Sequence, residues 1–318
     1  MDAKVSLLIA ETCEFLGGGE VVGGVDGINP RFLLFNAPNS ICSHKVRTVL
    51  AFHKIAYNSC TMNIAAGDTY FPAYVRLRLH ACDYDGLPLV SGHDGSTSVS
   101  SQGCDPAVVP TLVDWETGQV VIDSRKICIY LDALMPEEMS LYPQQLQPEI
   151  DAQLNSIDDL PNYQLMIGGL ARAGAKMGRA VAQEGAGFAM AKVTRCQNYM
   201  VRYAHEADLM RAYGAKQLKE LKAAEVLFSD KDMEKARNLA QSLCARLDNL
   251  LGRDGNNWLL GNDLTMADLW WAIQLIRFKS VGLAIWEGGS LPHIDRFFKT
   301  AIGLGAIRLA ILQWPDAL

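Results

Sequence analysis

The sequence predicts a protein of two unlike parts, a small mixed α/β unit followed by an all-helical unit. Between residues 31 and 136, the spacing of apolar side chains changes from a period of two to a period of 3.6 and back. From residue 147 to the end, no segment has convincing strand-like alternation, and several long windows have helical periodicity. Of the 318 residues, 49% are hydrophobic and 20% are charged, which is enough apolar mass for two cores.

The α/β unit, residues 31–136, is expected to contain a βαβ segment followed by a ββα segment. That order places helices against a small mixed sheet and is the plan of a thioredoxin-like fold. The last two strands are joined by Trp115-Glu116-Thr117-Gly118, which is typical of a hairpin, and Pro136 ends the final helix. The expected strands are residues 32–35, 57–62, 111–113 and 120–122, and the expected helices are residues 42–53 and 124–134.

Two segments of this half are expected to lie outside the regular elements. Residues 1–30 contain Gly17-Gly18-Gly19 and Gly23-Gly24, and they are predicted to form a flexible extension. Residues 78–105 are rich in Gly, Ser and Asp and form a long insertion. Loops of this length are usually functional or disordered, so the insertion either covers a functional site or decorates the surface.

The all-helical unit, residues 147–318, has one sharply specified helix start. Thr265 and Asp268 have the spacing of a capping box, and Leu264 and Leu269 have the spacing of a hydrophobic staple. The helix that follows is apolar nearly all round, which predicts burial in the core of the unit. The clearest helical windows are residues 208–226, 231–251 and 266–281.

Composition and charge exclude several functional classes. The net charge is −6 and the isoelectric point is near 5.5, which argues against a nucleic-acid partner. No apolar stretch approaches the roughly 18 residues that cross a bilayer, and no secretory signal is evident, so no membrane partner and a cytoplasmic location are expected. The eight cysteines have irregular spacing and include no Cys-x-x-Cys pair, which favours reduced thiols.

The strongest chemical signal is Cys42, which follows an apolar strand and a turn and opens a predicted helix. Free backbone N–H groups and the positive end of the helix dipole favour a thiolate at such a position. Ser43 adds a hydroxyl donor, and Lys45 and Arg47 add positive charge. The alternative interpretation is a buried structural cysteine.

Four further residues complete a pattern that resembles the glutathione S-transferase superfamily. Val109 and Pro110 precede a strand, and Asp123 and Ser124 lie at a strand-to-helix turn. The resemblance extends over residues 31–318 and implies a thioredoxin-like glutathione-binding domain followed by an all-α substrate domain. It implies that Val109, before a cis-proline, pairs its backbone with the cysteinyl part of glutathione, while Asp123 and Ser124 hold the γ-glutamyl group.

Within that superfamily, the cysteine at the start of the first helix makes the sequence similar to the bacterial chlorohydroquinone reductive dechlorinases. These enzymes are related to zeta-class enzymes. The segments that carry this resemblance are residues 40–47, 74–79, 108–114 and 313–315. It implies that glutathione, as cosubstrate and without a metal, displaces chloride from a chlorinated hydroquinone. Cys42 then attacks the sulfur of the conjugate, and a second glutathione releases the mixed disulfide. Ser43, with Ser40 as alternative, would hold the glutathione thiolate, and family habit implies a homodimer.

Several alternatives remain open at this point. The rival functions are a zeta-type isomerase, a glutathione-dependent thioltransferase or deglutathionylase, and a non-catalytic ligand carrier on the same fold. Arg277 either holds a hydroquinone oxygen or pairs with a surface carboxylate. The side chains offered for a substrate pocket are Tyr163, Met166, Tyr199, Tyr203, Trp271, Phe278 and Trp286.

Two other groups of polar residues receive structural interpretations. A metal site is not expected at His80, Cys82, His93 and Cys104, because their gaps follow no known zinc pattern. A run of alternating charges is interpreted as a solvated helix face. Its members are Lys216, Lys219, Glu220, Lys222 and Glu225.

Overall fold

The structure is a computed structural model that describes residues 2–24, 29–174, 178–253 and 257–318. Met1 and residues 25–28, which belong to the predicted N-terminal extension, lie outside the described residues. Residues 175–177 and 254–256 of the predicted helical unit lie outside them as well.

A five-stranded mixed sheet forms the centre of the first half, with the strand order β1-β3-β2-β4-β5. β2 pairs in parallel with β3 and antiparallel with β4, and β5 closes a hairpin with β4. All five residues of β2 are buried, because helices cover both faces of the sheet. The strands are β1 (Glu20–Val22), β2 (Phe32–Asn36), β3 (Tyr57–Thr61), β4 (Thr111–Asp114) and β5 (Val120–Ile122).

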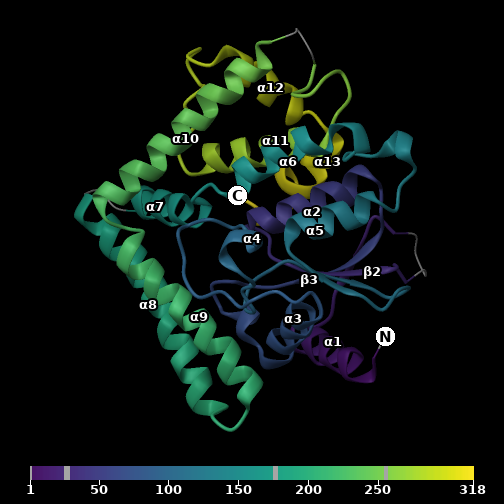
Figure 1. Cartoon of the computed structure of the whole chain (residues 1–318), viewed down its shortest axis with the longest axis vertical. Coiled ribbons are helices and arrows are strands. Elements are labelled where there is room, and N and C mark those ends of the chain that lie inside the picture. The colour runs from purple at the N-terminus through teal and green to yellow at the C-terminus, as the bar shows by residue number, and fades with distance from the viewer. Residues whose placement is uncertain (1, 25–28, 175–177, 254–256) are drawn as a thin grey trace.

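Helices pack on the two faces of this sheet, and the predicted thioredoxin-like arrangement is confirmed (Figure 1). One face is covered by α2 and α5, which contact each other, and the other face is covered by α1 and α3. The helical elements of this half are α1 (Ala3–Phe15), α2 (Ile41–Phe52), η1 (Asp68–Tyr70), α3 (Pro72–Tyr84), α4 (Val99–Gln102), α5 (Ser124–Asp132) and η2 (Glu137–Met139).

The predicted flexible N-terminal extension is wrong for the described residues, because it contains α1 and β1. Val5, Leu8 and Ile9 of α1 are buried in the core that covers one sheet face. Gly17, at φ 76°, takes the left-handed backbone that ends the helix, and a side chain at Gly19 would collide with the Cys60 sulfur. Gly17 therefore allows the chain to end the helix, and Gly19 allows the backbone to pass close to β3.

The insertion begins later than expected, because α3 continues as helix to Tyr84. Pro72 starts this helix, and its apolar side chains face α1 and the sheet. The later part of the insertion is tied to the helical half, since Ser96 Oγ and Thr97 N donate to the Asp158 carbonyl. The insertion thus bridges the two halves of the chain.

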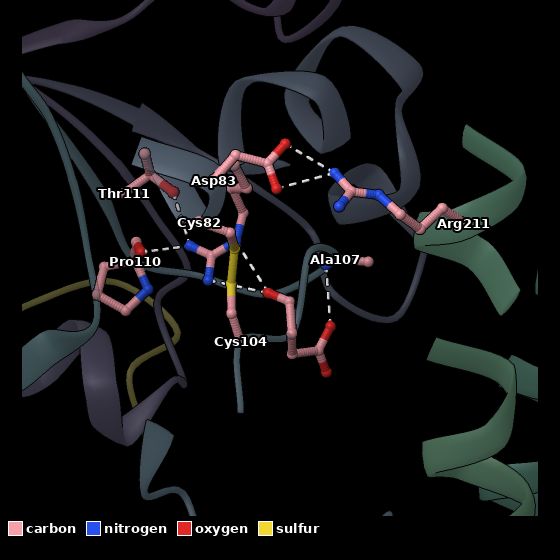
Figure 2. Close-up of a disulfide and its surroundings, with 9 residues drawn as sticks. Cys82, Asp83, Cys104, Ala107, Pro110, Thr111 and Arg211 are labelled. Atoms are coloured by element: carbon pink, nitrogen blue, oxygen red, sulfur yellow. Dashed lines mark hydrogen bonds and ion pairs between the residues drawn. A yellow bond between two sulfur atoms is a disulfide. The ribbon is translucent and has the colours of Figure 1, made fainter. Parts of the chain in front are cut away.

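A disulfide closes the insertion at its base and corrects the expectation that every cysteine is reduced. Cys82, on α3, is bonded to Cys104, and both residues are buried. Figure 2 shows this bond beside Pro110 and Thr111 at the start of β4. The other six cysteines are free thiols.

The second half is helical, as predicted. The start of α11 carries the predicted capping box, and Asp268 Oδ1 also accepts from Leu259 N. α11 is buried, with Trp270 and Trp271 in a core that extends to α2 and α5. Its helical elements are η3 (Gln144–Leu146), α6 (Gln147–Asp158), α7 (Asn162–Gly174), α8 (Gly178–Arg202), α9 (Ala207–Val226), α10 (Asp230–Leu251), α11 (Met266–Ser280), α12 (Pro292–Ala301), α13 (Gly305–Ile307) and η4 (Arg308–Leu312).

α8 and α9 form a long pair along one side of the molecule (Figure 1), and the interpretation of the α9 charges as a solvated face is wrong. Lys216 and Glu220 are buried, whereas Lys222 and Glu225 are exposed and pair with each other. The Lys216 ammonium lies 2.6 Å from Asp105 Oδ2 of the insertion and 3.0 Å from Glu220 Oε1. Lys219 reaches the same Asp105 oxygen at 2.8 Å.

Candidate functional site

The register of the sheet brings three turns together at one end of the strands. Phe35 on β2 lies opposite Thr111 on β4, and Thr111 lies opposite Ile122 on β5. The segments that follow β2 and β5 and the segment that precedes β4 therefore meet at the same end of the sheet. The segments concerned are the β2–α2 turn with Cys42, the Val109-Pro110 pair before β4, and the Asp123-Ser124 turn after β5.

The β2–α2 turn is held by side chains of α2 itself. Ser40 is the N-cap of α2, and its Oγ accepts from the Ser43 backbone N–H. Arg47 donates to the carbonyl oxygens of Ala37 and Pro38 at 3.0 and 2.9 Å. The guanidinium is thus used to fix the turn, so it does not provide the positive charge that the sequence suggested for Cys42.

Cys42 lies in the first turn of α2 and is partly exposed. Burial raises the pKa of its thiol, while the Lys45 cation and a hydrogen bond with the Ser124 side chain lower it. The net direction is upward, which is opposite to the thiolate-favouring shift expected from the sequence. The contact with Ser124 connects the first turn of α2 with the first turn of α5.

Lys45 is the cation that lies beside this thiol. Its Nζ is 2.8 Å from Asp158 Oδ1 and 3.6 Å from the centre of the Trp270 ring. Burial alone would lower the pKa of Lys45, but the Asp158 carboxylate raises it above the ordinary value, so the residue is charged at neutral pH. The lowering of the Cys42 pKa by Lys45 is partly offset, because the Asp158 carboxylate raises the pKa of the same thiol.

The structure contradicts the role expected for Ser43. Its side chain is fully buried, and its Oγ accepts from the Ala37 backbone N–H at 3.1 Å. A hydroxyl in that position closes the turn beneath the helix start and does not face a ligand at the surface. Ser40, the alternative, is partly exposed.

The Val109-Pro110 peptide bond is cis, as the family resemblance implies. Arg78 Nη1 donates to the Pro110 carbonyl at 2.7 Å and to Thr111 Oγ1 at 2.8 Å, and Tyr74 donates to the Val108 carbonyl at 2.7 Å. Across the described residues, the Val109 backbone N–H and carbonyl have no protein partner. Both groups are therefore free to pair with an extended peptide ligand.

The turn after β5 leads into a capped helix start. Asp123 has φ 73° and caps α5, with its Oδ1 accepting from Lys126 N at 3.0 Å. Burial raises the pKa of its carboxyl group. Ser124, the first residue of α5, is buried and contacts Cys42. A carboxylate bound at this helix start would lie close to the Cys42 thiol.

Arg277, on α11, faces the same place from the helical half. It is 8% exposed, one guanidinium nitrogen donates to the Asn39 carbonyl, and its Nε has no hydrogen-bond partner. Burial lowers the pKa of Arg277, and the Cys42 thiol acts on it in the opposite direction. The suggested pairing with a surface carboxylate is thus wrong, and the unpartnered Nε was not evident from the sequence.

The side chains offered for a substrate pocket are distributed among three cores. Trp271, Phe278 and Trp286 are buried in the main core, and Tyr163 and Met166 pack around Phe228. Tyr199 stacks with Tyr203 and Tyr70 and makes a tilted ring contact with Tyr213. These contacts are those of structural aromatic residues.

The four possible metal ligands near the insertion do not converge. Cys82 and Cys104 are joined to each other, and His93 Nδ1 accepts from Gly95 N. Among the described residues, no group of three or more His, Cys, Asp or Glu side chains is placed to hold a metal ion.

With this geometry established, comparisons with known proteins identify the family. Residues 39–134 match the N-terminal domain of glutathione S-transferases. The chain belongs to the glutathione S-transferase family. Over 292 residues it is 32% identical to the 2,5-dichlorohydroquinone reductive dechlorinase of Sphingobium indicum, and the alignment covers 91% of this chain and 84% of that protein.

Solved structures agree with this fold. A glutathione S-transferase from Xylella fastidiosa has a TM-score of 0.52 at 17% identity, with 89% of this chain and 97% of that chain covered. Gtt2 from Saccharomyces cerevisiae has a TM-score of 0.53 at 13% identity, with 88% and 100% covered. In the parts of the chain that are described, no helix combines the length and apolar character needed to cross a bilayer.

Proposed function

We propose that this protein catalyses the glutathione-dependent reductive dechlorination of a chlorinated hydroquinone. The observation that carries the proposal is Cys42, a partly exposed thiol in the first turn of α2 that interacts with Ser124 and Arg277. The 32% identity to a reductive dechlorinase over 91% of the chain supports the substrate class.

In this proposal, glutathione binds at the end of the sheet where the three turns meet. The free backbone groups of Val109 pair with its cysteinyl residue, and Asp123 and Ser124 hold its γ-glutamyl end at the start of α5. Ser40, whose hydroxyl proton is available, donates to the glutathione thiolate in place of the buried Ser43.

The first chemical stage forms a glutathionyl conjugate. The glutathione thiolate attacks the chlorine-bearing carbon of an activated tautomer of the hydroquinone, a carbon–sulfur bond forms, and chloride leaves. Arg277 would hold the anionic oxygen of the substrate, because its guanidinium interacts with the Cys42 thiol and a charged donor favours an anion.

The second stage uses Cys42 as the nucleophile. Its thiolate attacks the sulfur of the conjugate, the sulfur–carbon bond breaks, and the ring carbon takes the electron pair and a proton. Cys42 is left as a mixed disulfide with glutathione, and a second glutathione releases it as glutathione disulfide. Two electrons thus pass from two thiols to the arene, with chloride as the leaving group.

We propose in addition that the protein is cytoplasmic and forms a homodimer. A reaction that consumes glutathione fits a compartment in which glutathione is abundant. Association through the sheet edge and the helices follows family habit.

The proposal is tested by incubating the protein with glutathione and a panel of chlorinated hydroquinones. We expect one chloride and one glutathione disulfide for each dechlorinated ring, measured by ion chromatography and mass spectrometry. Isomerised product without chloride would favour a zeta-type isomerase. Reduction of mixed disulfides without dehalogenation would favour a thioltransferase, which shares the Cys42 step.

Replacement of the proposed nucleophile gives a second test. Cys42→Ser should stop turnover at the glutathionyl conjugate, because the first stage needs no protein thiol. The conjugate is detected by mass spectrometry of the quenched reaction. Full dechlorination at an unchanged rate would contradict the role of Cys42.

A further inference from the structure

Two thiols outside the candidate site lie in direct contact. Cys13, in the last turn of α1, and Cys60, on β3, have sulfur atoms 3.6 Å apart. A disulfide needs a separation of about 2.05 Å, so a movement of about 1.5 Å joins them. Among the free cysteines, all of which lie in the described residues, this is the only pair in sulfur–sulfur contact.

The chain around these thiols is held close to β3. The Cys60 thiol lies 3.6 Å from the Gly18 carbonyl, and a Cβ at Gly19 would come within 2.9 Å of the Cys60 sulfur. Stacking of Phe15 on Phe71, with ring centres 4.1 Å apart, anchors the same end of α1. The contact of the two sulfurs is therefore part of a packed interface.

The two thiols differ in access. Cys13 is partly exposed, whereas Cys60 is buried. A hydrogen bond from Cys60 lowers the pKa of Cys13, and the same contact raises the pKa of Cys60. A small disulfide in solution can therefore reach Cys13 first, and Cys60 is placed to complete the exchange.

We propose that Cys13 and Cys60 form an oxidisable dithiol that glutathione disulfide converts into a bond between α1 and β3. The Cys13 thiolate attacks one sulfur of glutathione disulfide and releases one glutathione. Cys60 then attacks the Cys13 sulfur of the mixed disulfide, loses its proton and releases the second glutathione. The protein loses two hydrogen atoms, and glutathione disulfide is reduced to two glutathiones.

The consequence is a covalent connection between the N-terminal helix and the sheet. In the reduced protein, α1 is held by apolar packing against α3 and the sheet face. The bond would prevent α1 from separating while the rest of the domain is folded. It also makes the packing of α1 responsive to the ratio of glutathione disulfide to glutathione.

The test uses the full chain with Cys42→Ser, so that glutathione at position 42 cannot be mistaken for the predicted reaction. The protein is treated with glutathione disulfide, blocked with iodoacetamide and digested with trypsin. We expect a disulfide-linked pair of peptides, residues 5–31 with residues 55–76, which dithiothreitol separates. The oxidised protein should also have a higher melting temperature than the reduced protein.

Single replacements test the order of attack. Cys60→Ala should trap one glutathione on Cys13, whereas Cys13→Ala should leave Cys60 unmodified because that thiol is buried. Cys244→Ala removes another buried thiol and should leave the linked peptides unchanged. Absence of the linked pair, with Cys13 alkylated as freely as before treatment, would overturn the proposal. Because no halide chemistry is measured, this outcome is independent of the proposed dechlorination.

Discussion

At the residue scale, Cys42 is subject to opposing influences. Its place in the first turn of α2 favours a thiolate, but burial favours the neutral thiol and raises the pKa. Lys45 and Arg277 supply positive charge from two different helices, α2 and α11. The raised pKa favours the neutral thiol at neutral pH, and the two cations beside it would stabilise the anions of the proposed reaction.

The pH dependence of Cys42 follows from the direction of this shift. Because the pKa is raised, the thiolate fraction is small at neutral pH, and the rate of alkylation by iodoacetamide should increase with pH beyond the point where an ordinary cysteine levels off. Peptide mapping of residues 32–45 after timed alkylation measures this rate. A plateau near pH 7 would contradict the assigned direction.

Replacement of Lys45 tests the source of the positive charge. Lys45→Met should raise the Cys42 pKa further, because the Lys45 cation no longer lowers it and the Asp158 carboxylate beside the thiol loses its partner. Lys45→Arg retains the charge and serves as the control. Identical alkylation profiles for Lys45→Met and the native protein would show that Lys45 has no influence on the thiol.

Arg277 has a separate expected effect on the substrate. Arg277→Met should raise the KM for the hydroquinone about tenfold to a hundredfold, since a charge-assisted hydrogen bond is worth about 1.5–3 kcal/mol. The KM for glutathione should stay close to the native value, and Arg277→Lys should recover part of the loss. An equal rise of both KM values would point to a general disturbance of the α2 turn through Asn39.

At the element scale, α3 positions the loop before β4. The Arg78 guanidinium donates to the carbonyls of Asp105 and Pro110 and to Thr111 Oγ1, and Tyr74 donates to Val108. The backbone of Val109 is thus held from both sides while its own polar groups remain free. A helix that the sequence analysis did not recognise therefore supports the proposed glutathione contact.

Removal of this support should weaken both stability and binding. Arg78→Met should lower the free energy of unfolding by about 3 kcal/mol, because three buried oxygens lose a charged donor. It should also raise the Kd for glutathione, measured by calorimetry. Arg76→Met is the matched control on the same helix. Its ion pairs with Glu206 and Asp208 are partly exposed, and their loss should change stability by about 1 kcal/mol or less.

At the scale of the whole molecule, Asp105 connects the two halves. Its carbonyl oxygen accepts a hydrogen bond from Arg78 on α3. Its carboxylate accepts hydrogen bonds from Lys216 and Lys219 on α9. Ala107 N donates to the other carboxylate oxygen at 2.9 Å (Figure 2). The insertion is therefore a bridge that fixes the loop before β4 against the helical half.

Neutralising Asp105 should destabilise the protein strongly. Asp105→Asn leaves Lys216 and Lys219 facing one another in a buried position, and breaking a buried ion pair costs about 3–5 kcal/mol. Urea denaturation of the full chain measures the loss. Adding Lys219→Met to Asp105→Asn should recover part of it, because the repulsion between the two cations is then removed while Lys216 keeps its ion pair with Glu220. No recovery would show that the ion pairs are not the cause.

Acid should also weaken the buried ion pair between Lys216 and Glu220. Burial alone would raise the pKa of Glu220, but Lys216, Lys192 and Lys219 lower it to about 2. Because the folded pKa lies below the unfolded value, Glu220 contributes stability that is fully present above about pH 5 and is lost as the pH falls toward 2. Glu220→Gln should flatten the fall in melting temperature between pH 5 and pH 2.

The elements that the sequence predicted are those whose signals are local. The alternating and helical periods at β2, β3 and α2, the hairpin, and the Thr265–Asp268 capping box depend on residues a few positions apart. Likewise, Val109-Pro110 and Asp123-Ser124 each form a short motif, and the structure has the cis bond and the capped turn there. Local spacing and turn chemistry were sufficient for these features.

The burial of polar groups, and the partners that they face, depend on how distant segments pack. Lys216 and Glu220 have the spacing of a surface ion pair, and their burial depends on an insertion more than a hundred residues away. Ser43 has the composition of a site residue, but the turn encloses it. Local motifs were enough to place a thiol, a cis-proline and a capped turn along the chain. Burial and long-range charge, which depend on how distant segments pack, decided the protonation state of Cys42 and the partners of Arg277.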